Sequence, residues 1–127
     1  MDIATSFERL PNLVNGDAAL VRRGRFVDLD FLVRIGESSF HVAVEAGRIG
    51  RVERGPLLLR PSAFVVSAEA ETWRRFWQPM PAPGWHDLFA LTKEGRMTID
   101  GDLRPFMANL QYFKDVLAAP RLLAGKG

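Results

Sequence analysis

The sequence predicts an α+β fold, in which a mainly antiparallel, twisted sheet of about five strands is covered by helices. Three observations indicate this class. Apolar and polar residues alternate strictly from Val27 to Ile35, a second alternating run follows the pair Gly36-Glu37, and Leu103 to Leu117 carries apolar residues at helical spacing. Alternation with a period of two is typical of a half-buried strand, whereas spacings of three and four residues are typical of an amphipathic helix.

Length and composition are those of an ordinary globular chain. It has 127 residues, of which 47% are apolar and 25% charged, and it contains no cysteine. At this length we expect one domain, residues 1–127, with a single core. Without cysteine the chain alone can build no disulfide, thiol nucleophile, zinc–thiolate cluster or iron–sulfur site.

The N-terminus and the charge distribution bear on location and partners. Asp2 and Glu8 stand where a secretory signal has a basic start and an apolar run, and no segment approaches the roughly 18–20 apolar residues of a membrane span. We therefore expect a soluble, cytoplasmic protein. The net charge is +2 and the arginines are scattered among acidic residues. This pattern predicts no nucleic-acid partner and at most peripheral contact with a membrane.

The first half of the chain predicts helical turns followed by a hairpin. Residues 5–20 mix apolar and polar positions around Pro11, which is typical of short helical turns. Gly36-Glu37 has glycine at the first central position, as a type II′ hairpin turn prefers. The register set by this turn puts apolar residues of both strands on one face, through the pairs Val33 with Phe40, Phe31 with Val42, Leu29 with Val44 and Val27 with Ala46.

Further strands are predicted after the hairpin. Gly47-Arg48 indicates a second turn, before a short strand at Ile49 to Glu53 whose arginine-rich side suits a sheet edge. A loop that ends at Pro61 precedes another β-rich stretch at residues 63–68, and a short strand is expected at residues 97–99.

Helices at residues 69–77, 85–94 and 103–118 are expected to cover the sheet. Ser67 can cap the first of them, and the proline-rich segment 79–84 forms a mobile joint before the second. Gly101-Asp102 turns the chain into the last helix, and residues 120–127 form a flexible tail.

Several of these segments together resemble the sterol carrier protein type 2 family, in its bacterial stand-alone form. The resemblance spans about residues 24–118 and is carried by Phe31-Leu32-Val33-Arg34-Ile35-Gly36, Phe40-His41-Val42-Ala43-Val44, Ala63-Phe64-Val65-Val66-Ser67, the Trp73 helix and Met97-Thr98-Ile99-Asp100-Gly101-Asp102. The Gly-Asp pair before the final helix is its most specific part. The chain departs from the family pattern in its proline-rich segment 79–84 and in its end, Ala124-Gly125-Lys126-Gly127, which is no peroxisomal address.

This resemblance implies a function. In that family an apolar tunnel between sheet and helices takes sterols, fatty acids or acyl-CoA esters. By resemblance, the chain is expected to bind an apolar lipid-like molecule, of the acyl, sterol or isoprenoid-quinone type, without catalysis and without a cofactor.

Large aromatic residues are the candidates to line such a tunnel. Two helices joined by a proline-rich segment carry more of them than one sheet face needs, which favours a cavity that can open. Each of them by itself also fits plain core packing. The predicted apolar pocket consists of Phe31, Trp73, Phe76, Trp77, Trp85, Phe89, Phe106, Met107, Leu110 and Phe113.

Polar residues offer weaker candidates. The hairpin's polar face carries a group that resembles a metal or acid–base site, although a solvated face explains it better: Asp28, Asp30, His41 and Glu45. His86 and Asp87 are adjacent on a predicted helix, so their side chains point in different directions and form no relay. Arg74-Arg75 either contacts a lipid head group or is solvated, and we favour the second interpretation.

Two further functional hypotheses remain open. The same fold with a filled core could serve as a non-catalytic interaction subunit, which forms a homodimer or docks on an enzyme of lipid, quinone or aromatic metabolism. A small enzyme that uses Asp28, Asp30 and His41 is disfavoured, because two histidines and no cysteine offer little catalytic material. We therefore expect no enzymatic activity and no metal site.

Overall fold

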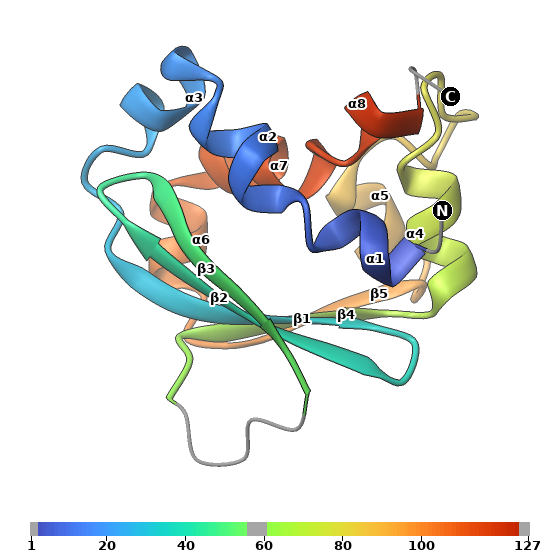
Figure 1. Ribbon diagram of the computed structural model, residues 1–127. Helices are drawn as coiled ribbons and strands as arrows, with labels where there is room; N and C mark the ends of the chain where they lie inside the picture. Colours follow the sequence, from blue (N-terminus) through green and yellow to red (C-terminus); the bar gives the residue numbers. More distant parts are fainter. Residues whose placement is uncertain (1–2, 56–60, 125–127) are drawn as a thin grey trace.

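The structure is a computed structural model that describes residues 3–55 and 61–124 (Figure 1). Most of the predicted loop before Pro61 and the end of the predicted tail, from residue 125, lie outside the described residues. The helices are α1 Ile3–Phe7, α2 Leu10–Asn15, α3 Ala18–Arg23, α4 Ala70–Phe76, α5 Leu88–Lys93, α6 Arg104–Ala108, α7 Leu110–Ala118 and α8 Arg121–Ala124. The strands are β1 Leu29–Ile35, β2 Ser38–Glu45, β3 Arg48–Arg54, β4 Phe64–Ala68 and β5 Met97–Gly101.

One mixed sheet has its strands in the order β3-β2-β1-β4-β5, and Figure 1 shows the helices gathered on one of its faces. The α+β class and the five strands are confirmed. The neighbours β1 and β2, β2 and β3, and β4 and β5 are antiparallel, but β1 and β4 are parallel. The prediction of a mainly antiparallel sheet is thus confirmed, and the sequence did not predict the one parallel pair, because alternating residues look the same whichever way the partner strand runs.

The hairpin of β1 and β2 has the predicted register. Its facing pairs include Val33 with Phe40, Phe31 with Val42 and Leu29 with Val44. Gly36 has φ of 62°, as the first central residue of a type II′ turn requires. The pair Val27 with Ala46 was wrong, since the ladder begins at Leu29 and Val27 O instead accepts a hydrogen bond of 3.3 Å from Gly47 N.

The second turn lies at Ala46-Gly47, one residue earlier than predicted. Both residues have positive φ, 49° and 82°, as in a type I′ turn. The Asp28 carboxylate accepts a hydrogen bond of 2.8 Å from Ala46 N, which helps to hold an alanine in this uncommon conformation. This turn fixes the β2–β3 hairpin, whose ladder shifts by one residue between Ala43 and Val44.

The Ala46-Gly47 turn is docked tightly against the helices. A Cβ atom on Gly47 would lie 2.4 Å from Val21 O and 2.8 Å from Gly24 O. The buried Tyr112 hydroxyl on α7 donates a hydrogen bond of 2.6 Å to Gly47 O. The turn therefore joins the far end of the sheet to both the N-terminal and the C-terminal helices.

The variant Tyr112→Phe tests this junction, and we expect it to lower the free energy of unfolding by about 1–2 kcal/mol, because Gly47 O loses its buried donor. Burial raises the pKa of Tyr112. The folded state thus holds the hydroxyl proton more tightly than the unfolded state. The stability that the Tyr112 hydroxyl contributes is therefore lost as pH rises above about 10, the pKa of an unfolded tyrosine.

Urea denaturation of both proteins at pH 7 and pH 11 measures the two effects. Tyr112 is the only tyrosine of the chain, so absorbance at alkaline pH also follows its ionisation directly. An equal alkaline loss of stability in the wild type and in Tyr112→Phe would contradict the account.

The helix boundaries differ from those predicted. Ser67 lies in β4, and Glu69 is the N-cap residue of α4. The helix expected at residues 85–94 begins only at Leu88. The helix expected at residues 103–118 is broken at Asn109, whose side-chain amide donates to Pro105 O at 3.0 Å and so competes with the backbone ladder.

The predicted turn into the last helical segment is present. Gly101 ends β5, and Asp102 N donates to Ala63 O at 2.8 Å. The Asp102 carboxylate accepts hydrogen bonds from Arg104 N at 3.1 Å and Arg104 Nε at 2.9 Å. These bonds from Arg104 lower the pKa of Asp102.

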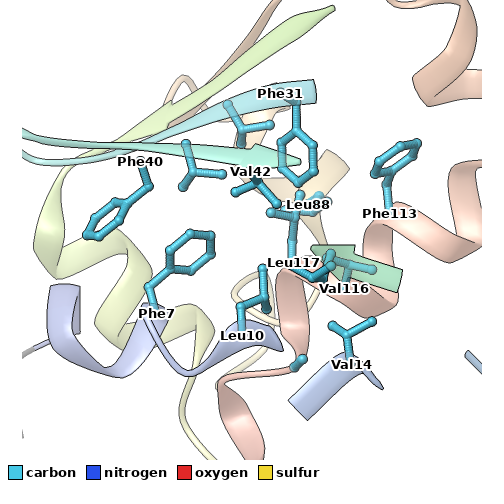
Figure 2. Close-up of a cluster of buried hydrophobic side chains, with 14 of the residues drawn as sticks. Phe7, Leu10, Val14, Phe31, Phe40, Val42, Leu88, Phe113, Val116 and Leu117 are labelled. Carbon is cyan, nitrogen blue, oxygen red and sulfur yellow. The ribbon is translucent and has the colours of Figure 1, made fainter. Parts of the chain in front are cut away.

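The core lies between the sheet and the helices, and the chain ends contribute to it (Figure 2). The predicted N-terminal turns are helices α1 to α3, and Phe7, Leu10 and Val14 from α1 and α2 are fully buried. The predicted flexible tail was wrong at its start, because Pro120 is buried and residues 121–124 form α8. Over residues 3–55 and 61–124, every helix falls short of the length and apolar character that a bilayer crossing requires.

Candidate functional site

Most of the predicted pocket residues lie in the core between sheet and helices. Phe31 comes from β1, Trp73 and Phe76 from α4, and the others from later helices and loops. The fully buried members are Phe31, Trp73, Phe76, Trp77, Phe106 and Phe113. Trp85, Phe89 and Leu110 are partly buried against this core, and Met107 is 53% exposed.

The buried rings pack directly against one another. Phe113 meets Phe31 edge to face with ring centroids 5.6 Å apart and stacks on Phe106 at 5.6 Å. Trp73 and Trp77 lie 5.0 Å apart. The indole N–H groups are satisfied, because Trp73 donates to Arg34 O at 2.9 Å and Trp77 to Leu117 O at 2.6 Å. In this structure the rings pack together as a core cluster.

Sequence reasoning missed other members of this aromatic cluster. Phe7, Phe40, Phe64 and Tyr112 all make ring contacts within it. Phe40 and Phe64 are buried on β2 and β4; the hairpin register had put Phe40 on the apolar face, and the period-two pattern could have added both residues to the predicted pocket. Phe7 had no such signal, since α1 is only one turn long.

A cavity of about 610 Å³ opens between the N-terminal and C-terminal helices. Its walls come from α2, α3, α7 and α8, with Pro79 from the segment after α4. The lining residues are Leu13, Asp17, Ala19, Leu20, Arg23, Pro79, Asp115, Ala118, Ala119, Arg121 and Leu122. We call it the α3–α8 cavity.

The floor of the α3–α8 cavity belongs to the core. Leu20 and Ala119 line it and are only 5% and 7% exposed, and Leu13 and Ala118 pack against the core cluster. None of its lining residues was predicted as a site residue. The signal was weak, because α2, α3 and α8 are short and Leu122 lies in the predicted flexible tail.

The charged groups around this cavity are mostly paired. Arg23 forms an ion pair with Asp115, which also accepts a hydrogen bond of 3.0 Å from Gln111. The Asp17 side chain caps α3 by accepting from Leu20 N at 3.1 Å. Arg121 donates from Nε and Nη2 to Phe76 O, at 3.1 Å and 2.7 Å.

A second cavity, of about 340 Å³, runs along the same stretch of α7. It shares Asp115, Ala118 and Arg121 with the α3–α8 cavity, and Phe76 and His86 also line it. Asp87, at its other side, pairs with Lys114 at 3.0 Å. Arg121 therefore lines both cavities.

Trp85 packs against the edge of the core and has two arginines near its ring. The guanidinium carbons of Arg75 and Arg96 are 4.8 Å and 4.6 Å from its ring centroid. These three residues line a cavity of about 390 Å³ at the N-terminal side of α4. Arg74 and Arg75 are exposed and pair with Glu71 at 2.5 Å and 3.6 Å, which agrees with the interpretation of solvated arginines.

The hairpin's polar group is dispersed. Asp28 binds the Ala46-Gly47 turn, and Glu45 is exposed. His41 is only 3% exposed, so the expectation of a solvated face was wrong for this residue; its Nε2 lies 3.1 Å from Asp30 Oδ2. Within residues 3–55 and 61–124, histidines and carboxylates nowhere gather in threes at a spacing that could hold a metal ion.

Comparison with solved structures finds close likeness in fold. The crystal structure of sterol carrier protein 2 has a TM-score of 0.73 at 11% identity, over 92% of this chain and 94% of that chain. A conserved hypothetical protein of Thermus thermophilus, described as a candidate sterol carrier protein, has a TM-score of 0.63 at 12% identity, over 94% and 89%.

The UbiJ-SCP2 ubiquinone synthesis protein has a TM-score of 0.59 at 17% identity, over 93% of this chain and 90% of that chain. No protein-family model and no curated protein sequence matches the chain. The similarity to these proteins is therefore one of fold and not of sequence. The chain has the sterol carrier protein type 2 fold.

Proposed function

We propose that the chain binds an apolar, lipid-like molecule and catalyses no reaction on it. The α3–α8 cavity carries this proposal. Its volume of about 610 Å³ lies within the range typical of small-molecule sites, roughly 300–1,000 Å³. Its floor consists of core side chains, so an apolar ligand placed there removes apolar surface from water at both partners.

The aromatic cluster is connected to this cavity through Arg121 and through the end of α7. The Arg121 guanidinium carbon is 5.0 Å from the centre of the Phe76 ring, and Trp77 is joined to Leu117 O at the end of α7. We propose that a long ligand reaches the predicted apolar pocket by separating α8 and the segment after α4 from α7. The tunnel between sheet and helices is then an opened form of the packed interior.

We favour a flexible chain, either an acyl chain or an isoprenoid tail, as the ligand class, because such a chain can adapt to a cavity between helices. The UbiJ-SCP2 neighbour is named a ubiquinone synthesis protein, which favours the isoprenoid-quinone class as the second candidate ligand. A non-catalytic role is supported by the structural use of the polar side chains, since Asp17 caps α3 and Asp115 pairs with Arg23.

A second candidate function is that of an interaction subunit. Large apolar side chains that are exposed favour it, namely Phe26, Met80, Leu103, Met107 and Leu122. In this role the chain would form a homodimer or dock on an enzyme. Solution mass separates the two functions, since a monomer that retains a lipid supports binding, whereas an empty obligate dimer or a co-purifying enzyme supports docking.

Blocking the cavity tests the proposed function. Ala19 and Ala18 are exposed neighbours at the start of α3, and Ala19 lines the cavity whereas Ala18 is outside its lining. We expect Ala19→Trp to weaken binding of a fluorescent fatty-acid probe by about tenfold or more, because the indole takes up cavity volume. Ala18→Trp, the matched control, should bind as the wild type does, and equal affinities of all three proteins would count against this cavity.

A further inference from the structure

Arg121 is shared by two cavities of the helical layer. It begins α8, lines both the α3–α8 cavity and the smaller cavity along α7, and its guanidinium lies over the Phe76 ring. Of the five N–H groups of an arginine, two donate to Phe76 O, and the other three make no hydrogen bond with the part of the chain that the structure describes.

The other charged groups of the two cavities have partners. Arg23 is matched by Asp115, and Lys114 by Asp87. Asp17 is engaged as the cap of α3. In the part of the chain that the structure describes, Arg121 is within ion-pair distance of no carboxylate, and burial lowers its pKa. A half-buried cation without a counter-charge, at the wall of a cavity whose floor is made of core side chains, is suited to an anionic ligand group.

We propose that Arg121 binds the carboxylate of a fatty acid whose chain lies in the α3–α8 cavity. The inference rests on the proposed function and narrows its ligand class, because sterols and quinones have no anionic head. The bond between Arg121 and Phe76 O holds the guanidinium in place before the ligand arrives, which reduces the ordering cost of binding.

The test compares decanoate with 1-decanol, which have the same chain and differ in the charge of the head. We expect the wild type to bind decanoate at least about tenfold more tightly than decanol. In Arg121→Gln this preference should vanish, because the amide can donate to Phe76 O but carries no charge. If Arg121 had only a structural role, Arg121→Gln would weaken the binding of both ligands alike, and the ratio of the two affinities would stay as in the wild type.

Two further variants complete the experiment. Arg121→Lys keeps the charge and should keep a preference for decanoate. Arg25→Gln makes the same change in net charge at an exposed arginine that lines neither cavity, and it should bind both ligands as the wild type does. Isothermal titration gives the affinities, and thermal unfolding confirms that each variant is folded.

The outcomes are distinguishable. A wild type that binds both ligands equally, or an Arg121→Gln protein that still prefers decanoate, overturns the role of Arg121 and leaves the proposed function standing. A wild type that binds neither ligand overturns the assignment of a fatty acid to this cavity, and the proposed function falls with it if the purified protein also retains no apolar molecule.

Discussion

Gly47→Ala is expected to lower the free energy of unfolding by about 3–5 kcal/mol, which would be among the largest effects of any single methyl group added to this chain. Alanine at φ of 82° already costs about 1–2 kcal/mol. The new Cβ would also lie 2.4 Å from Val21 O, a backbone atom that no side-chain rotation can move away. This clash can be relieved only if α3 shifts away from the turn. Such a shift breaks the close packing of Tyr112 over Gly24 and Gly47.

Gly95→Ala is the matched control. Gly95 has a similar φ of 74°, but nothing lies within 4 Å of the position that a Cβ atom would take there, so only the conformational cost of about 1 kcal/mol is expected. Urea denaturation of both variants separates conformational strain from steric conflict. Similar losses of stability at the two positions would contradict the close packing of the Ala46-Gly47 turn against α3.

Phe113→Ala is expected to lower the free energy of unfolding by about 3–5 kcal/mol. Phe113 is fully buried, and its ring contacts Phe31, Phe64 and Phe106. Removing it leaves a void bounded by rings from both the sheet and the helices, which cannot all move inward to fill it.

Met107→Ala provides the contrast, since the sequence places both residues on one apolar helical stripe. Met107 is 53% exposed, so we expect a change within about 0.5 kcal/mol. Thermal and urea unfolding of the two variants measure the difference. A loss at Met107 as large as that at Phe113 would contradict the break in the helical segment at Asn109.

The hairpin could be predicted from the sequence because its register depends on neighbouring residues alone. Gly36-Glu37 sets the turn, and the two alternating runs then match in only one register. The parallel pairing of β4 with β1 depends on a connection of several residues between β3 and β4, and alternation contains no information on strand direction.

The differences between predicted and observed helix boundaries have local causes. The stripe from Leu103 to Leu117 fits one continuous helix, but the backbone leaves the helical conformation at Asn109, where φ is −125° and ψ is 39°. The last predicted helix ends at Ala118, as expected, but the proline that follows is also compatible with the start of a new helix, and α8 begins directly after Pro120.

The candidate site was the least predictable part. Aromatic content pointed to Trp73, Phe76 and Phe113, and these side chains do gather between sheet and helices, where they contact one another. The α3–α8 cavity is built from Leu20, Ala119 and Arg121, on elements far apart in the chain, so only tertiary packing brings its walls together. Which helices leave space between them is not encoded in any local pattern.

Native mass spectrometry of the purified wild type, followed by organic extraction, tests the central claim most directly. We expect a monomer that retains one apolar molecule, which extraction identifies as a fatty acid or another single-chain lipid. A protein that carries no ligand, and that also leaves a fluorescent fatty-acid probe unbound, would contradict it.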